Sequence, residues 1–462
     1  MLPFKTLLTA ATLAGLLLYL DAWNWRAAAS LIEFRPRRIQ LSPTEDQIKD
    51  YAALPALPDK PDPRKIQDPA GNMAAVYTAL LATEQGRPGA VTRVVHYGES
   101  PTTADMITAD VRSLLQKKFG DAGHGFTLVA KPWAWYQHRG IEVRGEQWSI
   151  HPAHQGSLKD GLFGLGGVTF VGTAGSTATV KALDKSHTVV EFAYLSQPGG
   201  GSFQVFADKT PLGVVNTAAE SPSGGFAAFT VPEGVGEFSV GSVTGRVRLF
   251  GVRLGKASPG VMYDSIGLNG ASIMVPSRQF NEDHWLQQLR HANPHLVILN
   301  YGINESVYAA FVEASLEKEL RRVIGRVRKA LPAASLLVMA PMDRGGRDAS
   351  GAIITPPALT RVVEIQQKVA ADMGCAFFNT FQAMGGSGTM AKWYNDTPRL
   401  VSADLLHPMP AGARKVGELL YQALVQGFLR FKVEHLSQRA KLTLPDGDRH
   451  PGLAGDTANT QR

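Results

Sequence analysis

The chain has 462 residues, of which 44% are hydrophobic, and a formal net charge of +7. This length exceeds the needs of one small domain, and the apolar content excludes a chain that is disordered throughout. Lys and Arg are spread along the chain without a long basic block, which argues against a nucleic-acid-binding protein. The charge predicts a mild attraction to anionic surfaces such as cell-envelope polymers, and a solvated surface with no specific partner explains it equally well.

The N-terminal segment predicts export. Lys5 precedes an apolar run over residues 6–20 that stops at Asp21, and residues 27–29 are three alanines. Such a run is typical of a signal peptide and is short for a membrane span. We therefore expect residues 1–30 to be a signal peptide, or a signal anchor that tethers the protein to a membrane, and we expect a periplasmic or cell-envelope location. A buried N-terminal helix is the alternative.

The next segment, residues 31–90, is rich in Pro and charge and predicts a linker that ends in a short helix over residues 73–84. Residues 91–97 form an apolar run that leads directly into the Gly-Glu-Ser of residues 98–100. Residues 103–119 then carry apolar side chains at helical spacing. This order predicts a strand, a tight turn and a helix.

Residues 126–259 have a different pattern, with short alternating runs separated by Gly, Pro, Ser or Asp. Regularly spaced short strands with Gly-rich turns predict an antiparallel β-sandwich. The strands that we expect cover residues 167–170, 178–182, 188–195, 202–207, 226–231, 237–243 and 246–254.

After residue 260, expected strands alternate with expected helices. This alternation predicts a five-stranded parallel sheet with helices on both faces. The β-sandwich therefore interrupts one discontinuous α/β domain, formed by residues 91–125 plus 260–435, and residues 441–462 are expected to be a disordered tail. The strands are expected at 261–266, 295–301, 335–341 and 376–379, and the helices at 280–291, 314–330, 359–373 and 411–431.

Five residues that could take part in catalysis follow the expected strands or precede the last helix. In an open parallel sheet, active sites form beyond the carboxyl ends of the strands. Ser100 can act as a nucleophile, His407 can accept its proton, and Asp404 can orient the imidazole. The backbone N–H groups of Ser100 and Gly270 and the side-chain amide of Asn304 can form an oxyanion hole.

Taken singly, each of these residues also has a structural explanation. Ser100 and Asp404 can cap helices, and Asn304 can stabilise a turn. His96 is expected to be a structural neighbour of the turn and not the base. The only cysteine, Cys375, cannot form an intramolecular disulfide and lies in an apolar run, so we expect a buried thiol.

Together the segments resemble the blocks of the SGNH/GDSL hydrolase family. The matching segments read His-Tyr-Gly-Glu-Ser at 96–100, Gly-Leu-Asn-Gly at 267–270, Gly-Ile-Asn-Glu at 302–305 and Asp-Leu-Leu-His at 404–407. The resemblance implies a flavodoxin-like sheet, a Ser100–His407–Asp404 triad and no metal or organic cofactor. One departure is Glu99, where the family usually has Asp. Because this residue is outside the triad, the departure affects only the expected geometry of the turn.

The insert suggests a substrate. A β-sandwich within an exported SGNH domain resembles the bacterial peptidoglycan O-acetylesterases, which carry a carbohydrate-binding-module-like insert. Trp133, Trp135 and Tyr136 lie where the insert begins and could bind sugar rings, although core packing explains them equally well. The resemblance implies an esterase that removes O-acetyl groups from an envelope polysaccharide, with peptidoglycan as the first candidate. A polysaccharide O-acetyltransferase and a non-catalytic glycan-binding protein are the alternatives.

Overall fold

The computed structural model describes residues 62–443. By internal contacts the chain divides into two compact units, Met1–Ala56 with Val433–Arg462 and Leu57–Lys432. The fold and the site described below belong to the second unit. The expected signal segment, most of the expected linker and residues 444–462 of the expected tail lie outside the described residues.

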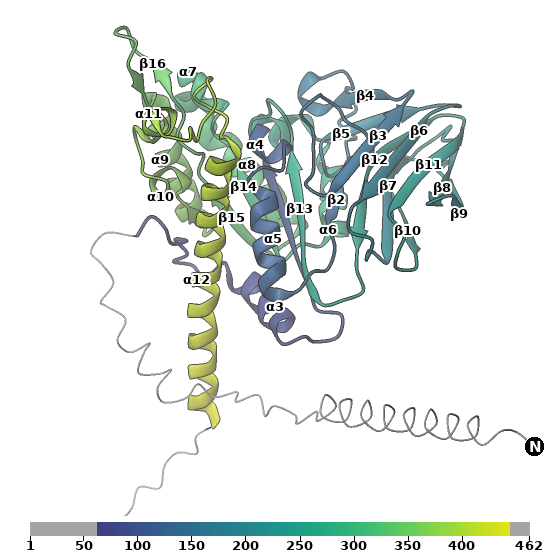
Figure 1. Cartoon of the computed structure of the whole chain (residues 1–462), viewed down its shortest axis with the longest axis horizontal. Coiled ribbons are helices and arrows are strands. Elements are labelled where there is room, and N and C mark those ends of the chain that lie inside the picture. The colour runs from purple at the N-terminus through teal and green to yellow at the C-terminus, as the bar shows by residue number, and fades with distance from the viewer. Residues whose placement is uncertain (1–61, 444–462) are drawn as a thin grey trace, which may run out of the picture. The chain divides into compact units, whose positions relative to one another are not determined.

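A five-stranded parallel sheet lies at the centre of the α/β region (Figure 1). The strand order is β13-β1-β14-β15-β18, and every neighbouring pair is parallel. Strands β13 and β15 are buried along their whole length, as the short apolar runs predict for a sheet covered on both faces. The predicted parallel sheet is therefore confirmed. Its strands are β1 (Val91–Gly98), β13 (Gly260–Gly267), β14 (Leu296–Asn300), β15 (Ser335–Met339) and β18 (Ala376–Phe378).

Helices cover both faces of this sheet. In β1, Val94 packs into the core shared with α3, α5 and α12, whereas Val95 and Tyr97 pack into the core shared with α6, α8 and α9. This alternation is the two-residue period of a strand. Within residues 62–443, no helix is both long enough and apolar enough to cross a membrane. The helices are α3 (Ala74–Glu84), α5 (Thr108–Phe119), α6 (Glu282–Ala292), α8 (Glu317–Ala330), α9 (Pro357–Asp372) and α12 (Pro410–Thr443).

The helix expected over residues 103–119 is wrong at its start. The chain forms a short helix, α4 (Ser100–Thr103), and then breaks before α5, because Asp105 adopts a left-handed conformation with φ of 51°. The buried Asp105 carboxylate accepts hydrogen bonds from Thr108 at 2.7 Å and from Arg112 at 2.6 Å. Apolar spacing continues across the break, so it could not reveal the interruption. The last helix also extends beyond its expected end at residue 431.

The insert contains two antiparallel sheets, as predicted. One has the order β10-β7-β12-β5-β4 with β2 paired to β12, and the other has the order β3-β6-β11-β8-β9. The sequence analysis missed β2, β3, β4 and β9. Strand β9 is mostly exposed and so lacks the alternation of apolar residues that marks a half-buried strand. The strands are β2 (Gly125–Thr127), β3 (Ile141–Glu146), β4 (Ser149–Pro152), β5 (Val168–Gly172), β6 (Thr177–Ala182), β7 (Val189–Ser196), β8 (Ser202–Ala207), β9 (Thr210–Asn216), β10 (Ser223–Thr230), β11 (Glu237–Thr244) and β12 (Val247–Gly255).

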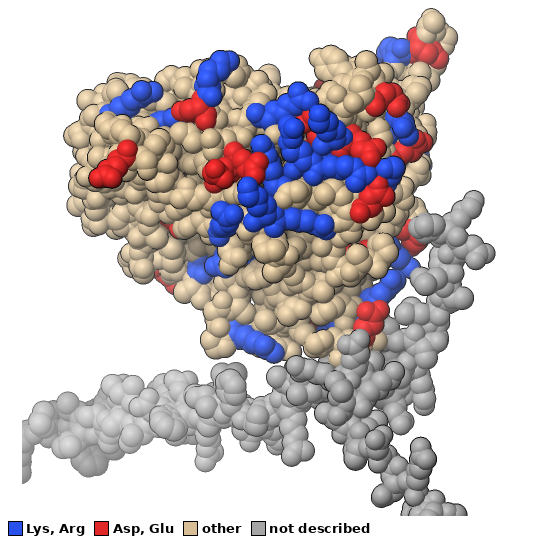
Figure 2. Space-filling model, turned by 180° about the vertical axis from the view of Figure 1, so that it is seen from behind, with Lys and Arg blue, Asp and Glu red and all other residues tan. Residues whose placement is uncertain are grey.

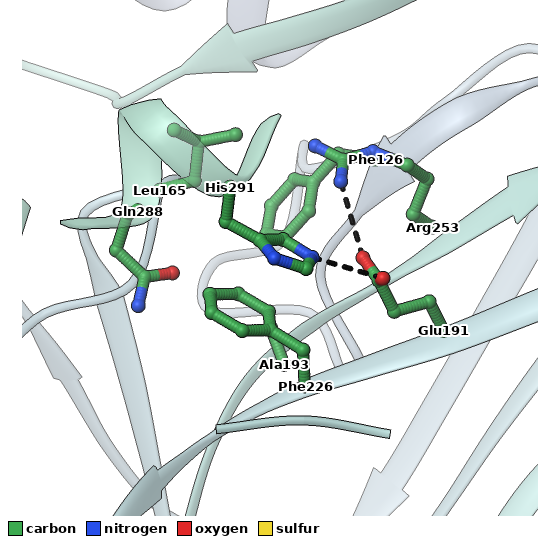
Figure 3. Close-up of a pocket in the computed structure, with 8 residues that line it drawn as sticks. All are labelled: Phe126, Leu165, Glu191, Ala193, Phe226, Arg253, Gln288 and His291. Carbon is green, nitrogen blue, oxygen red and sulfur yellow. Dashed lines mark hydrogen bonds and ion pairs between the residues drawn. The ribbon is translucent and has the colours of Figure 1, made fainter. Parts of the chain in front are cut away.

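The insert packs closely on the α/β region at α6 and β13. Figure 3 shows Glu191 of β7 between Arg253 and His291, with the Phe226 ring stacked on the His291 ring at 3.4 Å between centroids. Arg253 also pairs with Asp264 of β13 at 2.8 Å. One apolar core extends from the α6 face of the sheet into the insert. Because both regions belong to one compact unit, the expected boundaries at residues 125 and 260 stay a prediction.

Shorter elements complete the described fold. The loop after β15 carries a two-stranded hairpin that forms part of the projection beside β16 in Figure 1. These elements are η1 (Ala153–Gln155), η2 (Val275–Gln279), η3 (Glu305–Val307), α7 (Ala309–Phe311), η4 (Val312–Leu316), β16 (Gly346–Arg347), β17 (Ile353–Ile354), α10 (Thr380–Ala383) and α11 (Thr389–Asn395).

Candidate active site

Ser100 lies at the point where β1, the second strand in the order of the sheet, passes into α4. Glu99 is still extended, with φ of −96° and ψ of −154°, and Ser100 is the first helical residue. The backbone N–H groups of a first helical turn have no acceptor within the helix and can therefore face a ligand. Helix α4 packs closely against the neighbouring strand β13, because a Cβ added at Gly267 of that strand would lie 2.0 Å from the Thr103 nitrogen.

His407 and Asp404 lie on a closed loop that leads into α12. An antiparallel bridge joins Val401 to Pro408, and the Ser402 N–H donates to the His407 carbonyl at 2.8 Å. Leu405 has a φ of +60°, which is strained for a branched residue and is held by a hydrogen bond from the Gly345 N–H to its carbonyl at 2.7 Å. The loop therefore has a defined shape that fixes the imidazole.

The structure brings the three residues of the expected triad together. His407 Nε2 lies 2.8 Å from Ser100 Oγ, and His407 Nδ1 lies 2.6 Å from Asp404 Oδ2. Both distances allow hydrogen bonds, so an uninterrupted path connects the hydroxyl, the imidazole and the carboxylate. This is the arrangement that a serine nucleophile, a general base and an orienting carboxylate require.

The environment of Asp404 keeps it ionised. Burial opposes its charge, but hydrogen bonds from the Ser402 hydroxyl, from the His407 ring and from the backbone N–H groups of Leu406 and His407 hold its pKa well below the usual range. An ionised carboxylate beside Nδ1 leaves Nε2 free to accept the Ser100 proton. The side chain therefore has the charge that its expected role needs.

The expected oxyanion-hole residues lie on two neighbouring loops. Gly270 is exposed and has a φ of +71°, and a Cβ there would meet no atom within 4 Å. Backbone conformation thus favours glycine at this position. The Asn304 amide donates one N–H to the Ala271 carbonyl at 2.7 Å, which joins the two loops and leaves its second N–H for another acceptor. The roles of Gly270 and Asn304 as oxyanion donors stay predictions.

Glu99, the departure from the family pattern, points away from the triad. Its side chain is buried and accepts hydrogen bonds from the successive backbone N–H groups of residues 302–304, at 3.4, 3.2 and 3.0 Å. The residue before the nucleophile therefore holds the loop that carries Asn304.

The three aromatic residues expected to bind sugar have different surroundings. Tyr136 is 3% exposed, and its hydroxyl accepts a hydrogen bond from the Leu128 N–H at 2.8 Å. Its ring belongs to the core and is nearly covered, and the role of Tyr136 in substrate binding stays a prediction. Trp133 is partly buried against the same core, and Trp135 is 66% exposed. Trp135 is therefore the member of the group with a ring face open to a ligand.

Two other titratable side chains, His96 and Cys375, are buried and do not belong to the triad. Burial lowers the pKa of His96 to about 3, and its Nδ1 lies 2.7 Å from the Tyr263 hydroxyl, as expected for a structural neighbour. Cys375 is buried as expected, and burial raises the pKa of its thiol to about 11. Within residues 62–443, no group of three or more His, Cys, Asp or Glu side chains is arranged to hold a metal ion.

Sequence reasoning missed Arg344. Its guanidinium donates to the Ser306 hydroxyl at 2.7 Å and to the Ser306 carbonyl at 3.0 Å, two residues after Asn304. The next residue, Gly345, holds the Asp404–His407 loop through the Leu405 carbonyl. This segment thus connects the Asn304 loop with the loop of the base. No local motif marks it, because its partners are distant in the sequence.

Comparison with known proteins gives a family match over part of the chain and a shared fold. Residues 231–415 match the GDSL-like Lipase/Acylhydrolase family, a range that contains Gly270, Asn304, Asp404 and His407 but not Ser100. No curated protein matches the chain.

Several solved structures are similar. A peptidoglycan O-acetylesterase is 22% identical, with a TM-score of 0.68, over 79% of this chain and 99% of its own, which shows a shared fold. A family two carbohydrate esterase from Clostridium thermocellum, in complex with cellohexaose, is 13% identical over 57% of this chain and 95% of its own, with a TM-score of 0.27. A salicylyl-acyltransferase from a tetracycline biosynthetic pathway is 13% identical over 63% and 98%, with a TM-score of 0.30. Scores this low carry no argument. The family match shows that residues 231–415 are similar to the GDSL-like Lipase/Acylhydrolase family, and the first structure shows a shared fold.

Proposed function

We propose that the protein is an exported serine esterase that removes O-acetyl groups from a cell-envelope polysaccharide, with peptidoglycan as the first candidate. The observation that carries the proposal is the hydrogen-bonded path from Ser100 Oγ through His407 to Asp404. The fold shared with a peptidoglycan O-acetylesterase supports the choice of substrate.

The reaction has two steps. Ser100 Oγ attacks the acetyl carbonyl carbon while His407 Nε2 takes the hydroxyl proton, and the negative charge on the carbonyl oxygen faces the N–H groups of Ser100, Gly270 and Asn304. The bond to the sugar oxygen breaks, and His407 gives its proton to that oxygen. Water then attacks the acetyl-enzyme with His407 as base, so that acetate leaves and Ser100 regains its proton.

The charge of the protein suits an anionic envelope polymer. The formal net charge is +7, and Figure 2 shows Lys and Arg side chains gathered in a band on one face, bordered by Asp and Glu. Such a surface raises the local concentration of an anionic polymer without specific contacts. Residues 1–30 would direct the protein to the periplasm or cell envelope, as a cleaved signal or as a membrane tether.

The direct test is acetate release by the purified protein from O-acetylated peptidoglycan and from acetylated xylan. We expect release from peptidoglycan, and a loss of about 10³-fold or more in Ser100→Ala. Ser223→Ala, on β10 of the insert, is the matched control and should keep full activity. Equal rates in wild type and Ser100→Ala would refute the serine mechanism, and a preference for xylan would move the substrate away from peptidoglycan.

The same preparation distinguishes hydrolysis from transfer. Water and a sugar hydroxyl compete for one acetyl-enzyme, so an added oligosaccharide acceptor should leave acetate release unchanged in an esterase. Acetylation of the acceptor, with little free acetate, would favour a transferase instead.

A further inference from the structure

Two buried glutamates meet beneath the proposed site. Glu99 directly precedes Ser100, Glu305 directly follows Asn304, and their exposed fractions are 4% and 1%. Within residues 62–443, neither carboxyl forms an ion pair with Lys, Arg or His. Buried carboxyls without a counter-charge are costly when ionised, so this pair needs another explanation.

The contacts of the pair indicate a shared proton. Glu99 accepts hydrogen bonds from the backbone N–H groups of residues 302–304, which directly precede Glu305, so the two buried carboxyl groups are neighbours. Two neighbouring carboxyl groups can hydrogen-bond each other only when one of them carries a proton. One Glu305 oxygen accepts the Ile273 N–H at 2.6 Å, whereas the other has no N–H or O–H donor among the described residues. That second oxygen can accept a proton held by Glu99.

The same contacts connect three of the segments that build the site. Glu99 continues into Ser100 and holds the backbone of residues 302–304. Glu305 holds Ile273, which lies three residues after Gly270. The pair therefore lies between the nucleophile and both loops that carry the expected oxyanion donors.

We propose that Glu99 and Glu305 share one proton and act as positioning residues, which hold the donors of Gly270 and Asn304 at a fixed place relative to Ser100. The proposal rests on the proposed function, because it concerns the same site. Neither glutamate touches the substrate. Small errors in the placement of such donors lower the reaction rate strongly, since the oxyanion is stabilised only at hydrogen-bond distance.

The electrostatic surroundings favour the protonated pair. Burial raises the pKa of both carboxyls, and the neighbouring charge of Glu305 raises that of Glu99 further. Tyr301, at the end of β14, also faces the pair, and burial raises the pKa of its phenol. Arg344 is held on Ser306, next to Glu305 in the chain, by its two hydrogen bonds. At alkaline pH, loss of the shared proton would leave two adjacent buried charges that repel and separate the loops.

The test is the pH profile of kcat on a chromogenic acetyl ester, measured with the full chain. We expect kcat of wild type to fall at alkaline pH as the pair loses its proton. In Glu305→Gln, the amide N–H replaces the shared proton and the amide oxygen still accepts the Ile273 N–H. This variant should keep near-wild-type kcat at neutral pH and lose the alkaline fall.

A second variant removes the contact. Glu305→Ala should lower kcat by about 10²-fold, with little change in KM, because the oxyanion donors are displaced. Glu319→Gln is the matched control, since Glu319 is also fully buried but is paired with Arg278. It should keep the neutral-pH kcat and the alkaline fall of wild type.

Infrared spectroscopy gives a readout besides activity. At neutral pH, wild type should show the C=O band of a protonated carboxyl, and Glu305→Gln should lack it, because Glu99 is then ionised. An unchanged band in Glu305→Gln, or an alkaline fall identical to that of wild type, would overturn the shared proton. Activity that survives in Ser100→Ala would instead refute the proposed function, so the two failures are distinguishable.

Discussion

The parallel sheet and the antiparallel insert are built from similarly short apolar strands, but they place the ends of those strands differently. All five parallel strands end at the same edge, so Ser100, Asn304 and the Gly270 loop gather there although Ser100 and Asn304 are 204 residues apart in the sequence. Neighbouring strands of the insert alternate in direction and spread their ends over two edges. Strand direction therefore explains why the candidate site residues lie together at one edge of the parallel sheet and not in the insert.

The edge of the parallel sheet that carries the site also buries charge differently from the insert. In the insert, the buried Arg248 is paired with Asp160 at 2.6 Å. At the edge of the parallel sheet, Glu99 and Glu305 are buried without such a partner. Paired charges stabilise a fold, whereas unpaired titratable groups often mark functional sites.

The largest expected difference between the regions is in activity. Asp404→Asn should lower kcat by about 10³–10⁴-fold, because the amide no longer fixes the His407 tautomer or stabilises the imidazolium. The matched control in the insert is Asp208→Asn, at a turn with φ of 51° that Asn also adopts readily. Esterase assays of both variants should separate them by at least about 10³-fold, and similar rates would contradict the role of Asp404.

The next largest effect concerns stability. Phe238 of the insert and Phe378 of the parallel sheet are both fully buried, and truncation of either to Ala should cost about 3–5 kcal/mol of unfolding free energy. Phe238 lies in the apolar core that extends from the sheet into the insert and Phe378 in the core on the other face of the sheet, but both belong to one compact unit, so we expect a single thermal transition that both variants lower. Calorimetry checks this prediction. Two transitions, with Phe238→Ala moving only one, would show that the regions unfold independently.

A smaller effect should appear as the pH falls. Burial lowers the pKa of His96, in the sheet, to about 3 and that of His138, in the insert, to about 4. Both depressed values mean that the folded state binds these protons later than the unfolded state. Their stabilisation is thus complete above the ordinary value of 6.5 and is lost as the pH falls below it.

Urea titrations at several pH values measure this effect. Each histidine should contribute a loss of up to about 1.4 kcal/mol per pH unit. His96→Gln should reduce the slope between about pH 6.5 and pH 4.5, within the range of histidine titration. A slope equal to that of wild type would show that His96 does not contribute.

The smallest expected effect concerns the sugar. Trp135 of the insert and Tyr308, four residues after Asn304, are exposed by 66% and 68%. If the insert binds the glycan, Trp135→Ala should raise KM on the acetylated polymer by about 2–10-fold and leave a small chromogenic ester unaffected. An effect of Tyr308→Ala alone would instead place the sugar at the edge of the parallel sheet.

The sequence predicted the parallel sheet well because each of its strands is a compact apolar run between helices. It also predicted that Ser100, Asp404 and His407 would meet, since strand direction determines where the loops lie. It could not predict the break at Asp105, whose partner Arg112 satisfies the buried charge only in the folded chain.

The aromatic residues show the other limit of sequence reasoning. Trp133, Trp135 and Tyr136 are close in the chain, and composition alone does not determine which of them packs inward. The Tyr136 hydroxyl finds partners in Thr127 and the Leu128 N–H, so this side chain is buried. Glu99 was noticed only as a departure, because its partner Glu305 lies two hundred residues away in the sequence.

Detection of an acetyl group on Ser100 during turnover is the sharpest test of the serine mechanism. The wild-type protein should be mixed with an acetylated substrate, quenched in acid during turnover, digested and analysed by mass spectrometry. We expect one acetyl group on the peptide that contains Ser100, and none on the same peptide of Ser100→Ala. Rapid acetate release with no acetyl group on Ser100, or with the group on another residue, would contradict this mechanism.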